Sequence, residues 1–144
     1  MVWLAVIFAF LVQWCLPVLP VLPPLLCLVG MEQGPQKGAE CGLLGGFLCL
    51  LAGCSPWILA LYPLMGGISG AVFHNASGVW GKWLRTAPVL MGAEALLVLG
   101  HWVAGAGLPA ALSVAWLEFW MSLACYPLAA GIGRIGKPRR QKLR

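Results

Sequence analysis

"LVQWCLPVLPVLPPLLCLVG", residues 11–30, is an apolar stretch interrupted by prolines at positions 17, 20, 23 and 24. Proline disfavours helix at the residue before it and is best tolerated at the start of a helix. We therefore predict a hairpin over residues 16–23 rather than the middle of one helix. Pro23 or Pro24 then opens a short second helix. We expect this helix to lie inside the protein, because irregular backbone exposed to hydrocarbon is not tolerated.

The composition around this stretch is that of an integral membrane protein. The chain has 144 residues, of which 61% are hydrophobic and 9% are charged, and its mean hydropathy is +0.91. Soluble domains are about 45–50% apolar and roughly 25% charged. The apolar runs do not alternate with polar residues as the strands of a membrane barrel do. Composition thus predicts an all-α membrane protein of one domain.

Six apolar segments are expected to cross the membrane. They are residues 2–16, 24–31 with their flanks, 39–53, 57–73, 88–104 and 110–131. The segments between them are polar or contain turn residues, and the longest are residues 31–40 and 74–88. The sequence predicts a compact bundle of six short transmembrane helices over residues 1–133, followed by a basic cytoplasmic tail over residues 134–144.

The basic residues indicate how this bundle is oriented. If the N-terminus lies in the cytoplasm, all nine lysines and arginines fall on the cytoplasmic side, and the outer loops carry none. Cytoplasmic loops of membrane proteins are enriched in these residues. We therefore predict a multi-pass protein with both termini in the cytoplasm. The basic tail is expected to attract anionic lipid head groups.

Glycines four residues apart indicate a close contact between the third and fourth predicted spans. Gly42 and Gly46 form one such pair, and Gly66 and Gly70 form another. Small residues at this spacing let two helix backbones approach each other in lipid. Only a few residues join the two spans, so we expect antiparallel neighbours that meet at these glycines. Packing against another subunit is the alternative.

Three ionisable residues lie within the last two predicted spans. Glu94 and His101 are seven residues apart, which places them on one face of a helix, and Glu118 lies in the final span. Such residues usually face a protein interior, a cavity or a partner. Three interpretations remain open: a protonated glutamic acid hydrogen-bonded within the bundle, a polar contact to a partner helix, or a functional acid in a transport or catalytic path.

The sequence contains no recognisable catalytic, cofactor or metal motif. It has no HExxH, GxSxG or P-loop pattern and no Asp, and its six cysteines form no CxxC pair. His74 and His101 are about one span apart, so we expect no shared metal site. Tryptophans fall near the expected membrane boundaries, which is typical of interfacial anchoring and argues against a nucleic-acid partner. A disulfide between Cys15 and Cys54 remains open.

The order of these features resembles the MreD family of bacterial rod shape-determining proteins. The resemblance covers nearly the whole chain, from the first span with "LVQ" and the proline hairpin to the last span, which ends "YPLAAGIGR" before the basic tail. Its centre runs from Gly34 to Phe73. There a polar turn leads into a span, a turn and a second span that carry Gly42, Gly46, Phe47, Pro56, Gly66, Gly67 and Gly70.

This resemblance implies a non-catalytic subunit of the machinery for cell elongation and peptidoglycan synthesis in the bacterial inner (plasma) membrane. The implied partners are the single-span protein MreC, the glycosyltransferase RodA, the elongation-specific class B penicillin-binding transpeptidase and the cytoplasmic MreB filament. The family's fold resembles the substrate-binding subunits of energy-coupling-factor vitamin transporters. That likeness supplies the alternative function, a substrate-binding membrane subunit of a small-molecule (vitamin) transporter.

The outer loops favour the scaffold over the transporter. A vitamin-binding subunit needs a pocket with convergent polar groups. The outer loops are short, uncharged and nearly devoid of hydrogen-bonding side chains.

Overall fold

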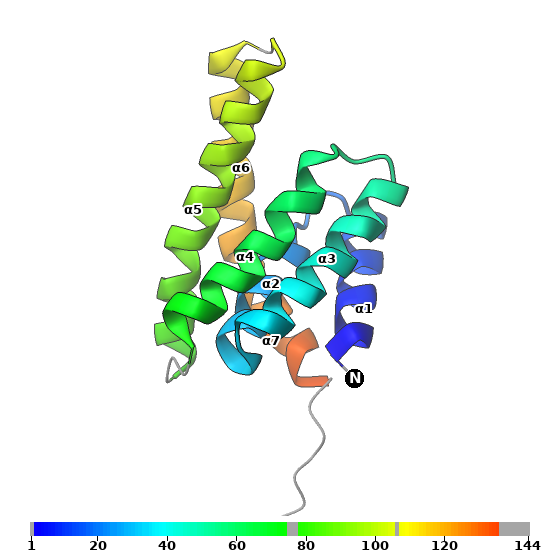
Figure 1. Cartoon of the computed structure of the whole chain (residues 1–144), viewed down its shortest axis with the longest axis vertical. Helices are drawn as coiled ribbons and strands as arrows, with labels where there is room; N and C mark the ends of the chain where they lie inside the picture. Colours follow the sequence, from blue (N-terminus) through cyan, green and yellow to red (C-terminus); the bar gives the residue numbers. More distant parts are fainter. Residues whose placement is uncertain (1, 75–77, 106, 136–144) are drawn as a thin grey trace, which may run out of the picture.

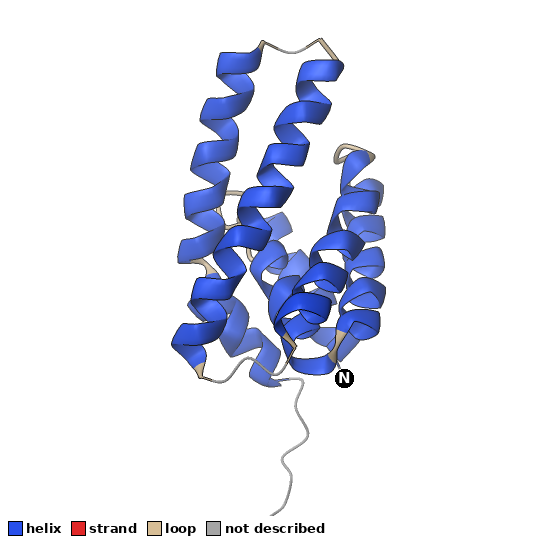
Figure 2. Ribbon diagram, turned by 60° about the vertical axis from the view of Figure 1, so that its left-hand side comes forward, coloured by secondary structure: helices blue, strands red, loops and turns tan. Residues whose placement is uncertain are grey.

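A computed structural model describes residues 2–74, 78–105 and 107–135, and in this part of the chain all regular structure is helical (Figures 1 and 2). The predicted all-α class is therefore confirmed. The helices are α1 (Val2–Cys15), α2 (Leu22–Gln33), α3 (Pro35–Leu51), α4 (Trp57–Phe73), α5 (Val79–Val103), α6 (Leu108–Ala124) and α7 (Tyr126–Ile135). Helices α5 and α6 form a long hairpin that rises beyond the ends of α3 and α4 (Figure 1).

Helix α2 is the centre of the bundle. It contacts each of the other six described helices, and Leu22, Leu25, Leu26 and Cys27 are completely buried. Its 12 residues begin directly before Pro23 and Pro24, and about 18 Å of helix follows from that length. The predictions of a proline hairpin and of a short internal helix are confirmed. The prolines are tolerated because the first N–H groups of a helix have no partner within the helix.

Glycines bring α2, α3 and α4 into backbone contact. A Cβ atom on Gly66 would collide with the backbone of Gly38, and one on Gly30 would collide with the Gly66 oxygen. Gly42 lies against Tyr62. Helices in lipid are held by such close packing rather than by the hydrophobic effect. The three helices therefore form one tightly packed unit.

The predicted contact of the two spans at these glycines is confirmed. Gly46 lies against Leu59, and Gly70 lies against Pro35. All four predicted glycines thus lie between α3 and α4, and each faces backbone of the other helix. The buried Ser69 hydroxyl strengthens the contact with α2, because its Oγ lies 3.1 Å from the Cys27 carbonyl oxygen and 3.0 Å from that of Gly66.

Two segments predicted as loops are mostly helical. Residues 31–40 contain one break, at Gly34, which has a φ of 95° and is followed by Pro35 at the start of α3. Residues 74–88 are helical from Val79, directly after Gly78, which has a φ of 79°. The prediction was wrong there because polar residues mark the expected membrane boundary and not the end of a helix.

The predicted final span, residues 110–131, is two helices bent by 45° between α6 and α7. Pro127 explains the break, because it has no N–H group to donate to the Leu123 carbonyl four residues before it. The indole N–H of Trp83 on α5 donates to that carbonyl instead, at 3.3 Å. Helix α7 reaches Ile135, so most of the predicted tail lies outside the described residues.

By length and hydropathy, the segment Trp80–Val103 is the one described helix that can cross a bilayer by itself, with 24 residues and a mean hydropathy of 1.4. Helices α6 and α7 pass the same test only when they are taken together as a bent span. The six crossings stay a prediction. The described basic residues lie in the first turns of α3 and α5 and the last turn of α7, at the same end of the bundle as the N-terminus (Figure 1).

Replacing Gly66 with Ala tests the backbone contact. The added methyl group would collide with Gly38, and we expect overpacking to lower the free energy of unfolding by about 1–3 kcal/mol. Gly92→Ala on α5 is the matched control, since a Cβ atom there meets no atom within 4 Å. Ala is the better helix former, so this variant should be unchanged or more stable by up to ~1 kcal/mol. Thermal unfolding in detergent measures both, and equal midpoints would contradict the close contact.

Candidate functional site

A cavity of about 550 Å³ lies between the α1–α2 hairpin and helices α4, α5 and α6. The hairpin contributes Pro17, Val18 and Pro20 to its apolar lining. Five polar side chains from four helices also line it: Gln13, Tyr62, Glu94, Glu118 and Ser122. Pockets that bind small molecules typically have this character, with about 300–1,000 Å³ of mostly apolar space and a few polar groups.

Glu94 and Glu118 face this cavity without a hydrogen bond from the described part of the chain. The Oε2 atom of Glu94 is buried and has no hydrogen-bond partner there, whereas Glu118 is exposed. The structure therefore does not show the hydrogen bond within the bundle that one interpretation of these acids requires. A buried carboxyl oxygen without a partner costs free energy, and a ligand or a partner protein that supplies a donor would offset that cost.

His101 joins the two acids at a second cavity, of about 290 Å³, between α5 and α6. Glu94, His101 and Glu118 all line it, so the structure brings the three predicted polar residues together. The His101 Nδ1 atom lies 2.8 Å from the Leu97 carbonyl oxygen. A carbonyl oxygen only accepts, so Nδ1 carries the proton in this contact. The seven-residue spacing placed Glu94 and His101 on one face, but Glu118 joins them only through the packing of α5 on α6.

Gln13 lines the large cavity but was not among the site residues predicted from the sequence. Its side-chain Oε1 accepts a hydrogen bond of 3.0 Å from the Leu22 N–H at the start of α2. No side chain caps α2 from its own N-cap position, so Gln13 supplies the acceptor across the hairpin. The sequence did contain a feature that could have identified Gln13: it is the single amide side chain in an otherwise apolar helix, just before a series of prolines.

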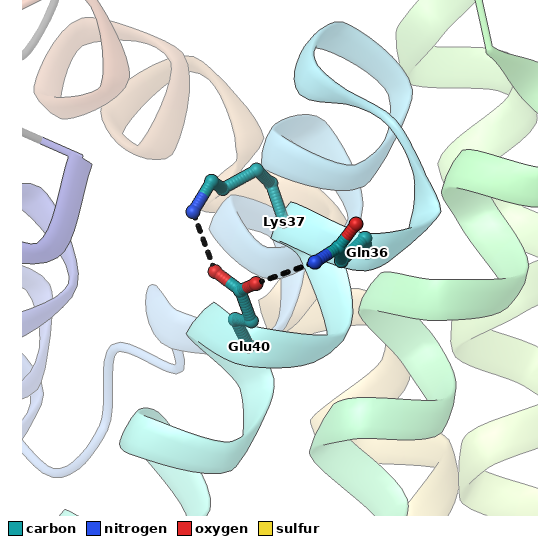
Figure 3. Close-up of polar contacts among 3 residues, drawn as sticks. All are labelled: Gln36, Lys37 and Glu40. Atoms are coloured by element: carbon teal, nitrogen blue, oxygen red, sulfur yellow. Dashed lines mark hydrogen bonds and ion pairs between the residues drawn. The ribbon is translucent and has the colours of Figure 1, made fainter.

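Two charged clusters lie at the opposite end of the bundle. Lys82 on α5 forms an ion pair of 2.7 Å with Glu32 on α2, and about a fifth of each side chain is exposed (20% and 18%). Lys37 and Gln36 both contact Glu40 within α3, at 2.6 and 3.2 Å (Figure 3). The second cluster lies on the surface, where ion pairs contribute little to stability. The Lys82–Glu32 pair instead joins two helices.

No disulfide bond joins Cys15 and Cys54 in the structure. All six thiols are free, and these two are exposed while the other four are buried. Cys54 lines the large cavity. Among residues 2–74, 78–105 and 107–135, no group of three or more metal-ligating side chains could hold an ion.

No known protein family, curated protein or solved structure matches the chain. The site is therefore interpreted from its own geometry and chemistry.

We expect Gln13→Leu to destabilise the hairpin. The change leaves the buried Leu22 N–H without an acceptor, which should lower the free energy of unfolding by about 1–3 kcal/mol. Gln36→Leu is the control, because Gln36 is an exposed amide with a surface partner. Chemical or thermal unfolding of the purified protein compares the two. Equal stability of both variants would show that the Gln13 contact does not hold the hairpin.

Proposed function

We propose that the chain is a multi-pass, non-catalytic scaffold subunit of the bacterial cell-elongation machinery, similar to MreD. In this role it binds MreC in the inner membrane and supports RodA, the class B transpeptidase and the MreB filament. The partners come from the family resemblance. The proposed fold is likewise the six-helix arrangement of the vitamin-binding transporter subunits.

The observation that carries the membrane part of this proposal is the apolar surface of the bundle. Large hydrophobic side chains are exposed on α1, α3, α4, α5 and α6. Leu51 is 71% exposed, Val103 74% and Trp80 81%. Soluble monomers rarely expose apolar patches larger than a few hundred Å². Lipid and partner helices are the surroundings in which such a surface is stable.

The position of the basic residues supports the proposed orientation. Lys37, Lys82, Arg85 and Arg134 belong to helix ends that lie together with the N-terminus (Figure 1). The hairpin before α2 and the α5–α6 connection lie at the other end and carry no Lys or Arg. The positive end is expected to face the cytoplasm.

Reporter fusions test this orientation. Alkaline phosphatase, which is active only in an oxidising compartment, should be active when it is fused after Gly107 and inactive when it is fused after Arg144. Green fluorescent protein, which fluoresces in the cytoplasm, is the complementary reporter and should give the opposite pattern. An active phosphatase at residue 144 would contradict the six crossings and the cytoplasmic C-terminus.

An apolar groove between α4 and α5 is the surface that we propose for the single span of MreC. Two adjoining hollows of about 310 and 290 Å³ form it, and Leu61, Leu64 and Leu96 line both. Gly92 also lines the groove, and the space beside its Cα is open. A small residue on an exposed helix face lets a second backbone approach, which is what a transmembrane partner helix requires.

Co-purification with MreC in mild detergent tests the proposed function. We expect wild-type protein to retain MreC and to restore rod shape in cells lacking their own MreD. Gly92→Leu should fill the groove and reduce retention about tenfold, the effect of losing ~1.4 kcal/mol of binding. The matched control is Gly131→Leu on α7, since Gly131 likewise has open space beside it. Failure of the wild-type protein to retain MreC would reject the scaffold function.

The large cavity favours the second candidate, a substrate-binding subunit of a transporter. The polar groups expected of such a pocket are absent from the outer loops, but helices α1, α4, α5 and α6 supply them. The composition of the loops therefore no longer separates the two functions. Co-purification of an ATPase module instead of MreC would favour the transporter.

A further inference from the structure

We propose that the 550 Å³ cavity binds a lipophilic organic cation, an amine with an apolar body whose ammonium group lies between the carboxyl groups of Glu94 and Glu118. This site goes beyond the scaffold function and does not depend on a partner protein.

The charges of the lining select for a cation. Glu94 and Glu118 are its ionisable acids, and no Lys, Arg or His of the described chain lines this cavity. His101 lines the neighbouring cavity instead, and Lys82 pairs with Glu32. Because the lining of the cavity itself carries two acids and no basic side chain, the cavity disfavours an anion. An ammonium group would be attracted by both carboxyl groups.

The carboxyl group of Glu94 indicates where the ammonium group binds, because Glu94 lines the cavity. Its Oε2 atom is buried and accepts no hydrogen bond in the described chain, so a turn of the side chain toward the cavity on binding would give this oxygen a donor. An ammonium group carries three N–H donors and no acceptor, so it can satisfy Glu94 and still donate to Glu118. Hydrogen bonds between charged partners are roughly twice as strong as neutral ones. A neutral lipid chain would fill the space but leave the Glu94 oxygen without a donor.

The rest of the lining accommodates an apolar body. Around the acids lie Ile58 and Leu61 of α4, Leu97 of α5, and Val114 and Leu117 of α6. Gln13 and Tyr62 add two polar groups, of which the Gln13 oxygen is already held by the Leu22 N–H. The volume lies within the range of sites for drug-sized molecules. The occupant is therefore a compact amphiphile.

Two cysteines allow binding of an amine in the cavity to be measured directly. Cys54 is exposed and lines the cavity, whereas Cys15 is exposed but does not line it. The purified protein in lipid nanodiscs is treated with a maleimide, with or without 4-phenylbutylamine, and mass spectrometry follows each peptide. The neutral isostere 4-phenylbutan-1-ol controls for partition into lipid. We expect the amine to bind about tenfold more tightly than the alcohol, since it adds hydrogen bonds to charged groups. At equal concentrations the amine should therefore slow modification of Cys54 more than the alcohol does and leave Cys15 unchanged.

Variants separate binding by the acids from apolar partition. In the Glu94→Gln/Glu118→Gln double variant the amine should protect Cys54 no better than the alcohol does. Glu40→Gln, at the exposed Lys37–Glu40 pair on α3, is the matched control and should keep full protection. If the double variant fails to fold, as judged by its melting midpoint, Glu118→Gln alone is used. Glu118 is exposed, and this variant should reduce the apparent affinity for the amine.

Three results would overturn the proposal. They are no protection of Cys54, equal protection by amine and alcohol, and protection that persists without both acids. The last two would mean apolar partition only. None of these results changes whether MreC co-purifies, so failure of this site and failure of the scaffold function are distinguishable.

Discussion

The backbone contact among α2, α3 and α4 is the constraint on which the rest of the structure depends. Gly30, Gly38 and Gly66 meet at one point, where no side chain larger than hydrogen has room. Because α2 is enclosed there, the chain must turn sharply at both of its ends. The proline hairpin provides one turn and Gly34 provides the other. Every other described helix packs on α2, so its position determines theirs.

Local steric signals in the sequence predicted this centre well. Four prolines cannot lie in the middle of a helix, and glycines four apart allow close packing whatever the remaining sequence is. The start of α5 was not predictable in the same way. The sequence predicts a loop over residues 74–88, yet Lys82 and Arg85 lie in the first two turns of a 25-residue helix. The polarity of a residue indicates whether water surrounds it and not whether its backbone is helical. A helix of about 38 Å is longer than the roughly 30 Å hydrocarbon layer of a bilayer, so its ends can carry polar residues.

Signals that depend on distant residues were missed. The sequence contains Pro127, but the bend between α6 and α7 is stabilised by Trp83, which donates to the Leu123 carbonyl 40 positions away in the chain. The candidate site likewise has a part that could be predicted and a part that could not. Glu94, His101 and Glu118 could be identified as ionisable residues in apolar spans. The role of Gln13 depends on the hydrogen bond that it accepts from the Leu22 N–H across the hairpin. The outer loops are apolar, as the sequence predicts, but polar side chains from helices α1, α4, α5 and α6 converge on the large cavity.

The two halves of the bundle are packed in different ways, and this difference explains where function is expected. In the α2–α3–α4 unit, five glycines lie so close to the backbone of a neighbouring segment that a Cβ atom would collide with it: Gly30, Gly38, Gly42, Gly66 and Gly70. On the hairpin of α5 and α6, a Cβ atom added to Gly81, Gly92 or Gly107 would meet no atom of another part of the chain within 4 Å. A Cβ atom added to Gly100 would meet the ring of Trp57 at 3.8 Å.

Helix α5 borders both cavities of the candidate site and both hollows of the groove. Cavities weaken packing, because atoms lining them lose contacts on one side. A partner helix in the groove or an amine at the two acids would restore such contacts without disturbing the glycine core. Binding beside α5 is therefore compatible with a rigid centre: the partner helix uses the groove between α4 and α5, and the amine uses the cavity that α6 also lines.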